Sequence, residues 1–466
     1  MVFNPTQGET KLANVPSCES GRVRIVLLFL VVGAVGFFLW REGTSGTPQI
    51  RLEQELKGIG RTTPVSFTVT DRRGLRGLTV QLEQGGQTLP VLAETYGSRW
   101  DFWRSGPRDF TGKILLGTSE QEELTDGQAT LRIQAWNPSW FSSQAELVKI
   151  VPVRSHPPSV QILSGLIYVN QGGSEMVLYR VSSSAVSSGV RVGSYFFPGY
   201  PLPGGQEGDR AALFAFPHDI SPDTTAVVTA QDEVGNEATA GFPHRVMTKK
   251  FRSRDIQLDE AFLQATVPAI FSQTPDLKDQ GDLLKNFLLV NGALRERNRA
   301  QIREIARQTV PEFLWQGPFL QLSNTAVESQ FADYRTYRYQ GQKVDEQVHL
   351  GFDLASVQHA PVVAANSGRV VFAEYLGIFG NTLVVDHGFG LQSLYAHLNS
   401  FQVKPGEVVK KGQVLGETDS TGLAGGDHLH FTMLLGGVEV NSIEWWDPLW
   451  IEQHIQAKLS TAKPAS

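Results

Sequence analysis

The sequence predicts a mainly β, multidomain protein with one apolar helix near its N-terminus. Three observations predict this class. An uncharged apolar run of 16 residues covers Ile25 to Trp40, two alternating stretches match each other at an offset of 95 residues, and the last third combines many glycines with short strand-like runs. With 466 residues, the chain is long enough for about three domains.

The apolar run is expected to form a transmembrane signal anchor at residues 23–41, after a cytoplasmic tail at 1–22. As a helix the run reaches ~24 Å, and Arg24 can extend the span toward the ~30 Å of a hydrocarbon core. The basic residues before it favour an N-terminus that stays inside and an exported remainder. No Ala-x-Ala site follows the run, so an uncleaved anchor is favoured over a cleaved signal peptide. Cys18 precedes the run, which argues against lipidation there.

Two β-rich regions follow, at residues 47–154 and 157–247. Thr130–Asn137 and Thr225–Asp232 align as alternating strands that each end in a polar turn residue. Their spacing is the size of an immunoglobulin-like β-sandwich, so two such domains are expected. Their surfaces could bind a protein partner. Aromatic residues could also line a sugar-binding surface, although core packing is favoured for them: Trp100, Phe102, Trp103, Trp136 and Trp140.

The pattern changes to helical at residues 255–310, where apolar residues recur at three- and four-residue steps. A run of arginines accompanies them: Arg295, Arg297, Arg299, Arg303 and Arg307. A solvated helix face, partly balanced by Glu296 and Glu304, is the favoured interpretation. The alternative is a latch that docks on a partner or on the neighbouring domain.

Composition excludes one broad class of function. The formal net charge is −6, whereas a nucleic-acid-binding protein usually presents a basic face. No nucleic-acid partner is therefore expected. The part expected to be exported contains no cysteine, so packing must hold it together without disulfides, and a bound metal would add to that packing.

The chemistry concentrates at residues 315–452, followed by a C-terminal tail at 453–466. Six of the 10 histidines lie between positions 349 and 430. His428 and His430 sit two apart in an apolar, strand-like stretch, so both rings project from one face. His349 and Asp353 are four apart, and an extended segment turns both to one side. Two imidazoles and one carboxylate are the ligand set of a catalytic zinc with an open fourth position.

These motifs resemble the lysostaphin-type (LytM-like) zinc metalloendopeptidases that cut peptidoglycan cross-links. The family pattern H-x-G-x-D falls on His349, Gly351 and Asp353, Y-x-H-L falls on Tyr395 to Leu398, and the Gly-rich H-L-H-F falls on Thr421 to Phe431. Gly380 to His387 resembles a further family strand. The chain departs from the family pattern at Ala424 to Asp427, where the family often has Ser-Thr-Gly-Pro.

The resemblance implies one Zn²⁺ per chain, held by His349, Asp353 and His430. It implies that His397 and His428 are the catalytic residues. His428 is expected to act as general base for the water, while His397 stabilises the oxyanion or passes a proton to the leaving amine, and these roles could be exchanged. The implied fold is a compact β-domain of the LytM type. The implied partner is peptidoglycan. Together with the anchor expected at residues 23–41, this predicts a single-pass protein of the bacterial inner membrane, with this domain in the periplasm or cell-wall space.

Two other functions are weighed against this one. A non-catalytic LytM-like regulator or scaffold of other cell-wall hydrolases would keep the fold without cutting. A lipoyl or biotinyl carrier would explain the glycine-rich strands, but Lys404, Lys410 and Lys411 lack the tight-turn setting that a carrier lysine needs. His359 and His387 are expected to be ordinary hydrogen-bonded residues outside the site.

Overall fold

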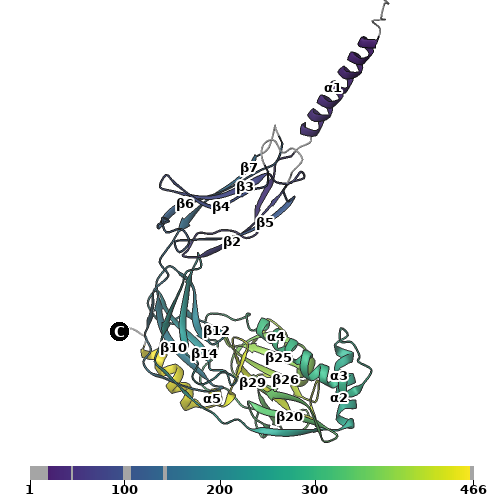
Figure 1. Ribbon diagram of the computed structural model, residues 1–466. Coiled ribbons are helices and arrows are strands. Elements are labelled where there is room, and N and C mark those ends of the chain that lie inside the picture. Colours follow the sequence, from purple (N-terminus) through teal and green to yellow (C-terminus); the bar gives the residue numbers. More distant parts are fainter. Residues whose placement is uncertain (1–18, 44–45, 98–105, 140–143, 462–466) are drawn as a thin grey trace, which may run out of the picture. The chain divides into compact units, whose positions relative to one another are not determined.

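The computed structural model describes residues 19–43, 46–97, 106–139 and 144–461, and the chain divides into two compact units, Met1–His156 and Pro157–Ser466 (Figure 1). Most regular elements in both units are strands gathered into several sheets, so the expected mainly β class is confirmed. Some residues singled out in the sequence lie outside the described ranges: Cys18, Trp100, Phe102, Trp103 and Trp140.

Helix α1 (Glu19–Gly43) contains the apolar run that the sequence assigns to a membrane anchor at 23–41. Among the helices in the described residues, none is both long enough and apolar enough to cross a membrane. The expected transmembrane helix is therefore not confirmed.

The first unit contains two antiparallel sheets around one core. The strands of the three-stranded sheet, in order, are β1 (Gln49–Leu52), β2 (Thr63–Thr70) and β5 (Asp109–Leu116). Those of the four-stranded sheet are β4 (Gln87–Thr95), β3 (Gly77–Gln84), β6 (Gly127–Trp136) and β7 (Gln144–Val153). Alternate residues of β6, such as Leu131 and Ile133, are buried with Phe67 of β2. This alternation turns one face of each sheet toward the shared core.

The second unit begins with two more antiparallel sheets. One contains β13 (Tyr200–Pro201), β14 (Asp209–Ala215), β10 (Ser174–Val181) and β8 (Val160–Ile162), and the other contains β12 (Tyr195–Pro198), β11 (Ala185–Val192), β15 (Ala226–Asp232) and β16 (Glu237–Gly241). A parallel pair, β9 (Ile167–Asn170) and β17 (His244–Met247), completes this region. The two stretches that align in the sequence occupy β6 and β15, and each is the third strand of its four-stranded sheet.

The segment at 255–310 is not helical from its start. It begins with strand β18 (Ser253–Leu258), which pairs in parallel with β20 (Asp333–Tyr339). The side chains of residues 253–258 alternate in exposure with a period of two, as is typical of a strand. The helices follow: α2 (Glu260–Gln273), α3 (Leu283–Leu289), the π-helical turn η1 (Val290–Leu294) and α4 (Arg295–Ile305). Asp259 and Asp282 cap α2 and α3, because their side chains accept the backbone N–H of Phe262 and of Lys285, the third residue of each helix.

The arginine run is only partly a solvated face. Arg307 is exposed and pairs with Glu304 at 3.0 Å, as expected for such a face. Arg295 and Arg299 are instead half-buried, because α4 lies against the last domain and its Ile302 and Ile305 pack into that domain's core. The helical segment is therefore a packed part of the second unit.

The last domain is built on one ten-stranded sheet. Its main path is β19 (Ala326–Ser329), β22 (Phe352–Ala355), β29 (Leu429–Leu435), β26 (Leu391–Phe401), β25 (Asn381–Asp386), β24 (Gly368–Tyr375) and β27 (Val408–Val409). Three short strands join at the side: β23 (Pro361–Val363), β28 (Val414–Thr418) and β30 (Val438–Val440). A separate sheet places β20 between β18 and β21 (Gln342–His349).

The expected tail at 453–466 begins inside helical structure. Helices α5 (Ser442–Trp446), α6 (Pro448–Ile451), the π-helical turn η3 (Glu452–Gln456) and α7 (Ala457–Thr461) follow the sheet. His454 and Lys458 contact buried Glu175 of β10, each at 2.6 Å. These contacts fix the end of the described chain to the second sandwich.

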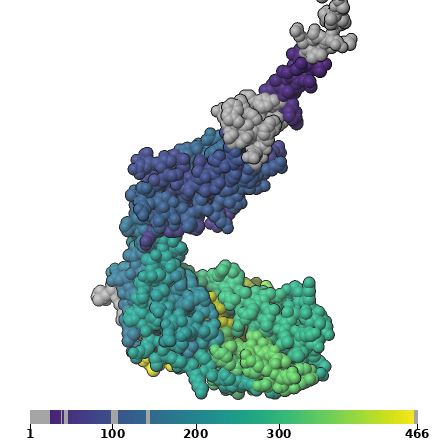
Figure 2. Space-filling view, in the orientation of Figure 1, coloured from purple at the N-terminus to yellow at the C-terminus, as the bar shows by residue number. Residues whose placement is uncertain are grey.

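The second sandwich and the last domain share a continuous hydrophobic core. At their junction, the Glu444 carboxylate accepts hydrogen bonds from Asn170 Nδ2 and the Ser174 backbone N, both at 2.7 Å. A Cβ on Gly173 would lie 2.3 Å from Glu444 Oε1, so only glycine allows this close approach. In Figure 2 the teal sandwich and the green regions of this unit form one continuous surface. The sandwich is therefore part of the body that holds the candidate site.

Candidate metal and catalytic site

Three strands bring the expected ligand residues together. His349 is the last residue of β21, Asp353 lies in β22, and His430 lies in β29 directly opposite Asp353 in the sheet register. His349 and Asp353 are not on one extended segment, because the chain bends between β21 and β22. The bend still turns both side chains toward His430.

The three donor atoms form a compact triangle. His349 Nε2 lies 2.9 Å from Asp353 Oδ1 and 3.0 Å from His430 Nδ1, and His430 Nδ1 lies 3.0 Å from Asp353 Oδ1. Donors at this spacing can all reach one ion at the usual 2.0–2.2 Å when it lies to one side of their plane. The other side of that ion would stay open.

The tautomer of His349 supports a metal between these groups. His349 Nδ1 lies 3.1 Å from the Gln330 carbonyl oxygen, which can only accept, so Nδ1 carries the proton. His349 Nε2 then presents a lone pair to the Asp353 carboxylate. Two electron-rich atoms at 2.9 Å need a cation or a proton between them, and these residues therefore fit a zinc ion.

Gly351 makes room for the His430 ring. A Cβ at this position would lie 2.6 Å from His430 Cε1 and Nε2, closer than real Cβ contacts. The space that the absent side chain leaves is occupied by the ring of a candidate ligand. Glycine is therefore required here by close approach and not by its backbone angles.

His428 and His397 lie beside the triangle and face each other. Their ring centroids are 4.8 Å apart, and His428 Nε2 lies 3.5 Å from Asp353 Oδ1. His428 Nδ1 donates to the Gly426 carbonyl at 2.8 Å, and His397 Nδ1 donates to the Thr421 carbonyl at 2.7 Å. His397 therefore keeps Nε2 free for proton transfer, and His428 directs its Nε2 toward Asp353.

The backbone of His397 is strained. Its φ is 60°, in the left-handed region that non-glycine residues rarely adopt. The Thr421 bond and a hydrogen bond from Asp419 N to the His397 carbonyl, at 2.9 Å, hold this conformation. Strain of this kind is typical of residues whose side chain must point into a functional site.

Burial and mutual charge separate the pKa values of the cluster. Burial opposes ionisation of Asp353, but the surrounding rings of His349, His428 and His430 outweigh it and hold the pKa of Asp353 well below its usual value. Burial lowers the pKa of His397 well below its usual value and that of His430 to about 4. Burial also acts on His428, yet the bond and charge of Asp353 raise its pKa overall. His428 is thus the more basic of the two free rings.

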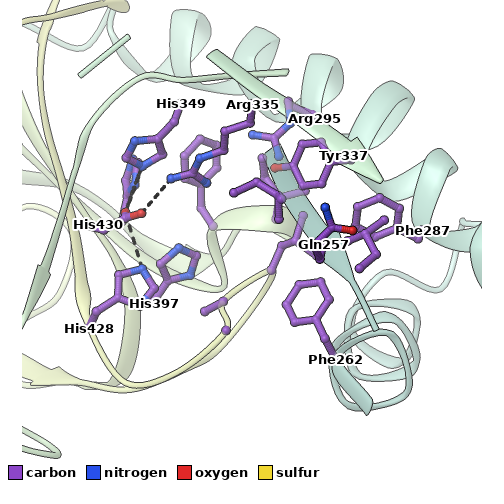
Figure 3. A pocket seen from close by; sticks show the side chains of 18 of the residues that line it. Gln257, Phe262, Phe287, Arg295, Arg335, Tyr337, His349, His397, His428 and His430 are labelled. Carbon is purple, nitrogen blue, oxygen red and sulfur yellow. Dashed lines mark hydrogen bonds and ion pairs between the residues drawn. The ribbon is translucent and has the colours of Figure 1, made fainter. Parts of the chain in front are cut away.

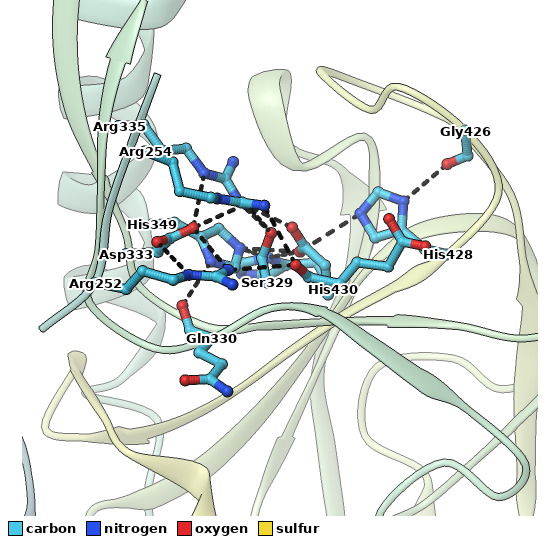
Figure 4. A network of polar contacts seen from close by, with 12 residues as sticks. Arg252, Arg254, Ser329, Gln330, Asp333, Arg335, His349, Gly426, His428 and His430 are labelled. Carbon is cyan, nitrogen blue, oxygen red and sulfur yellow. Dashed lines mark hydrogen bonds and ion pairs between the residues drawn. The ribbon is translucent and has the colours of Figure 1, made fainter. Parts of the chain in front are cut away.

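A network of arginines holds the outer side of Asp353, and sequence analysis missed it (Figure 4). Arg335 donates to Asp353 Oδ2 at 3.0 Å and to Ser329 Oγ at 2.9 Å. Fully buried Asp333 pairs with Arg252 at 2.9 Å and with Arg254 at 2.8 Å. Such partners orient a ligating carboxylate. A pattern in the sequence could have revealed this network. Asp333, Arg335 and Tyr337 are spaced two apart, which places all three on one face of β20.

The other histidines of the domain lie outside the triangle, as expected. His387 is buried, with Nδ1 at 2.8 Å from the Ser367 carbonyl oxygen and Nε2 at 2.7 Å from Ser393 Oγ. His359 contacts Asp427, whose Oδ2 accepts the His359 backbone N–H at 2.9 Å. The departure from the family pattern at Ala424 to Asp427 thus occupies a loop beside the site.

A cavity of about 370 Å³ opens onto the cluster (Figure 3). All five expected site residues line it, together with Phe262 and Phe287 of the helical segment. A second cavity, of about 730 Å³, runs along α2 and shares lining residues with the first: Asp259, Phe262, Ala424 and Gly425. The site therefore lies at one end of a longer groove whose far wall is the helical segment.

The sequence of the domain that holds the site is similar to that of known peptidases. Residues 347–442 match peptidase family M23. The DD-carboxypeptidase/endopeptidase Mpg of Neisseria meningitidis is 38% identical over 96 residues, which cover 21% of this chain and 22% of that protein. The chain thus spans about a fifth of the length of that relative. The peptidoglycan DD-endopeptidase ShyC of Vibrio cholerae is 26% identical over 335 residues, covering 61% of this chain and 75% of that protein.

Among solved structures, the catalytic domain of the antimicrobial peptidase lysostaphin from Staphylococcus simulans is 25% identical to this chain, with a TM-score of 0.25. The match covers 28% of this chain and 98% of the lysostaphin domain. The motif residues and the family match lie in the same stretch of the sequence. The C-terminal part of this protein is a LytM-like peptidase family M23 domain.

Proposed function

We propose that this protein is a zinc metalloendopeptidase that hydrolyses amide bonds in the peptide cross-links of peptidoglycan. One observation carries the proposal: the triangle of His349 Nε2, Asp353 Oδ1 and His430 Nδ1, with two free imidazoles beside it in the same cavity. Relatives named as peptidoglycan DD-endopeptidases support the substrate class.

His349, Asp353 and His430 would hold the zinc. When bound, zinc lowers the pKa of a coordinated water toward ~7 and polarises the scissile carbonyl. Arg335 keeps the Asp353 carboxylate turned toward the two histidines by occupying its other oxygen at 3.0 Å. The metal set is thereby oriented before substrate arrives.

His428 is proposed to take the proton from the attacking water. Asp353 raises the pKa of His428, which makes its Nε2 the better acceptor, and the same carboxylate stabilises the ring once it is charged. The proton that His428 takes is then passed to the leaving amine through His397, whose ring centroid lies 4.8 Å from that of His428. The lowered pKa of His397 makes its ring release that proton readily.

The groove along α2 is proposed to hold the peptide. Ala261, Ala265 and Ala269 of α2 line it, so the helix presents small side chains to the space. A peptide in extended conformation could run past these alanines with its scissile bond at the histidines. Action in the cell envelope follows from this substrate. Attachment to a membrane through residues 23–41, and a protein partner for the β-sandwiches, stay predictions.

The experiment is zinc content and release of cross-link fragments from peptidoglycan, measured on the full chain and on two variants. We expect one zinc and cleavage in the parent, loss of zinc in His430→Ala, and zinc without cleavage in His428→Ala. His359→Ala is the matched control, because His359 lies in the same domain outside the triangle, and it should keep both properties.

A non-catalytic regulator would retain zinc in the parent and release nothing from peptidoglycan. Zinc that survives in His430→Ala would contradict the ligand assignment, and cleavage that survives in His428→Ala would contradict its role as base.

A further inference from the structure

The cavity beside the histidines contains a cation whose charge the domain does not pair. Arg295, the first residue of α4, lies in the cavity wall between the histidines and the aromatic residues of the helical segment (Figure 3). Its side chain is exposed only in part, and burial lowers its pKa to about 10, so the guanidinium stays charged at neutral pH.

Its hydrogen bonds account for only part of the guanidinium. Arg295 Nε donates to the Asn291 carbonyl at 3.1 Å, and NH2 donates to Asn291 Oδ1. These bonds use two of its five N–H groups. Within the described part of the chain, no carboxylate lies within ion-pair distance of Arg295. The charge of Asp345 acts on the pKa of Arg295, but the Asp345 carboxylate accepts its hydrogen bond from Asn291 Nδ2, at 2.7 Å.

The neighbouring arginines are paired. Arg335 contacts Asp353 at 3.0 Å, and Arg299 contacts Glu296 at 2.9 Å. Arg295 lines the cavity as Arg335 does, but it differs from both neighbours because no carboxylate among the described residues pairs with it. A partly buried charge without a counter-ion costs free energy, and an arriving anion would recover it.

Part of the rest of the wall is apolar, although Gln257, Asp259 and Tyr337 also line the cavity. Ile256 and Leu258 of β18, Phe262 of α2, Phe287 of α3 and Leu423 also line the space. Such a lining lowers the local dielectric constant and strengthens a charge-assisted hydrogen bond. The apolar side chains also favour binding of a carboxylate that is part of a peptide over binding of a fully hydrated ion.

The position of Arg295 depends on an irregular turn. The π-helical turn η1 separates α3 from α4, and Arg295 is its first following residue. Asn298, one turn further along α4, accepts a hydrogen bond from the Ile378 backbone N at 3.0 Å. Because Ile378 and Phe379 line the same cavity, α4 fixes both the guanidinium and the opposite loop.

We propose that Arg295 forms a subsite that binds a substrate carboxylate next to the scissile amide. The inference rests on the proposed function and adds to it the charge of the group that must flank the reacting bond. The carboxylate can belong to a side chain or to the C-terminus of the peptide. The helical segment then completes the substrate site, and does not act as a latch over it.

The test uses three synthetic cross-linked peptides with the full chain. One peptide carries both carboxylates, one has only its side-chain carboxylate converted to an amide, and one has only its C-terminal carboxylate converted. Calorimetry on the chelated protein measures binding without cleavage, and chromatography of the zinc-loaded protein measures cleavage separately.

We expect one of the two amides to bind on the order of tenfold to a hundredfold more weakly than the parent peptide, and that amide identifies the source of the carboxylate. Arg295→Gln should lose this preference, and Arg295→Lys should recover part of it. Arg297→Gln is the matched control, because Arg297 lies on the same helix and pairs with Asp276 at the surface. It should keep the full preference.

Equal binding of all three peptides to the parent protein overturns the inference without any variant, and so does a preference that persists in Arg295→Gln. Cleavage without a carboxylate preference would leave the proposed function standing and remove the subsite. A carboxylate preference that depends on Arg295, in a protein that cleaves nothing, would support the subsite and contradict the proposed function.

Discussion

Replacing Gly351 with alanine should damage the metal site while leaving the fold in place. The new Cβ would lie 2.6 Å from two atoms of the His430 ring, whereas ordinary contacts begin at 3.4 Å. The ring must therefore retreat by about 0.8 Å or the bend at Gly351 must open. Either movement separates His430 Nδ1 from the two donors that lie 3.0 Å away.

The size of the effect follows from how strictly a metal site fixes its ligands. Metal–ligand distances vary by only about 0.2 Å, and a misplacement of about 1 Å costs on the order of a hundredfold in rate. We expect Gly351→Ala to weaken zinc binding by about tenfold to a hundredfold and to lower kcat/KM by about a hundredfold. The overpacking itself should cost about 1–3 kcal/mol of stability.

Chelator competition gives the zinc affinity, cleavage of cross-linked peptides gives kcat/KM, and thermal unfolding reports the fold. Gly425→Ala is the matched control, because Gly425 also lines the cavity but no atom lies within 4 Å of its added Cβ. It should bind zinc as the parent does. Zinc affinity and kcat/KM within threefold of the parent in Gly351→Ala would refute the argument that this glycine seats the His430 ring.

Three further predictions concern the surroundings of the site. Arg335→Gln should weaken zinc binding by about tenfold to a hundredfold in chelator competition, because Asp353 loses its orienting partner; Arg338→Gln, on the opposite face of β20, should leave it unchanged. Burial raises the pKa of Glu444 to about 7, above its ordinary value near 4.5, so its contribution to stability is full below pH ~4.5 and is lost as pH rises through ~7. Unfolding measured across this range should show a decline of about 3 kcal/mol in the parent that Glu444→Gln removes, and an equal decline in both would contradict it. Ile302→Ala should cost about 2–5 kcal/mol in denaturant unfolding, because this fully buried side chain joins α4 to the domain core; a cost below 1 kcal/mol would show that α4 is loosely held.

The candidate site was predictable from the sequence because its chemistry is written in residue types at short spacings. Two histidines two apart, and a histidine and an aspartate four apart, indicate a ligand set before any fold is known. The structure brings His349, Asp353 and His430 within bonding distance of one point, with His397 and His428 beside them. It also places the two matching stretches at equivalent positions in two sheets.

The supporting residues were not predictable in the same way, because their roles depend on elements far apart in the chain. Arg335 is 18 residues from the carboxylate it orients, and Glu444 is 274 residues from the Asn170 amide that it binds. The period-two alternation of residues 253–258 was overlooked beside the longer helical pattern that follows. The strand forms because β20 offers a parallel partner there.

The sequence by itself determined the β class, the family-like motifs and the donor residues of the candidate metal site, since these depend on local patterns. Only the tertiary structure decided that the helical segment walls the cavity, that the second sandwich shares a core with the last domain, and that Arg295 faces the cavity without a carboxylate partner among the described residues. The physical reason is that burial and charge pairing are properties of neighbours in space, and a buried cation is recognised only when everything around it is known.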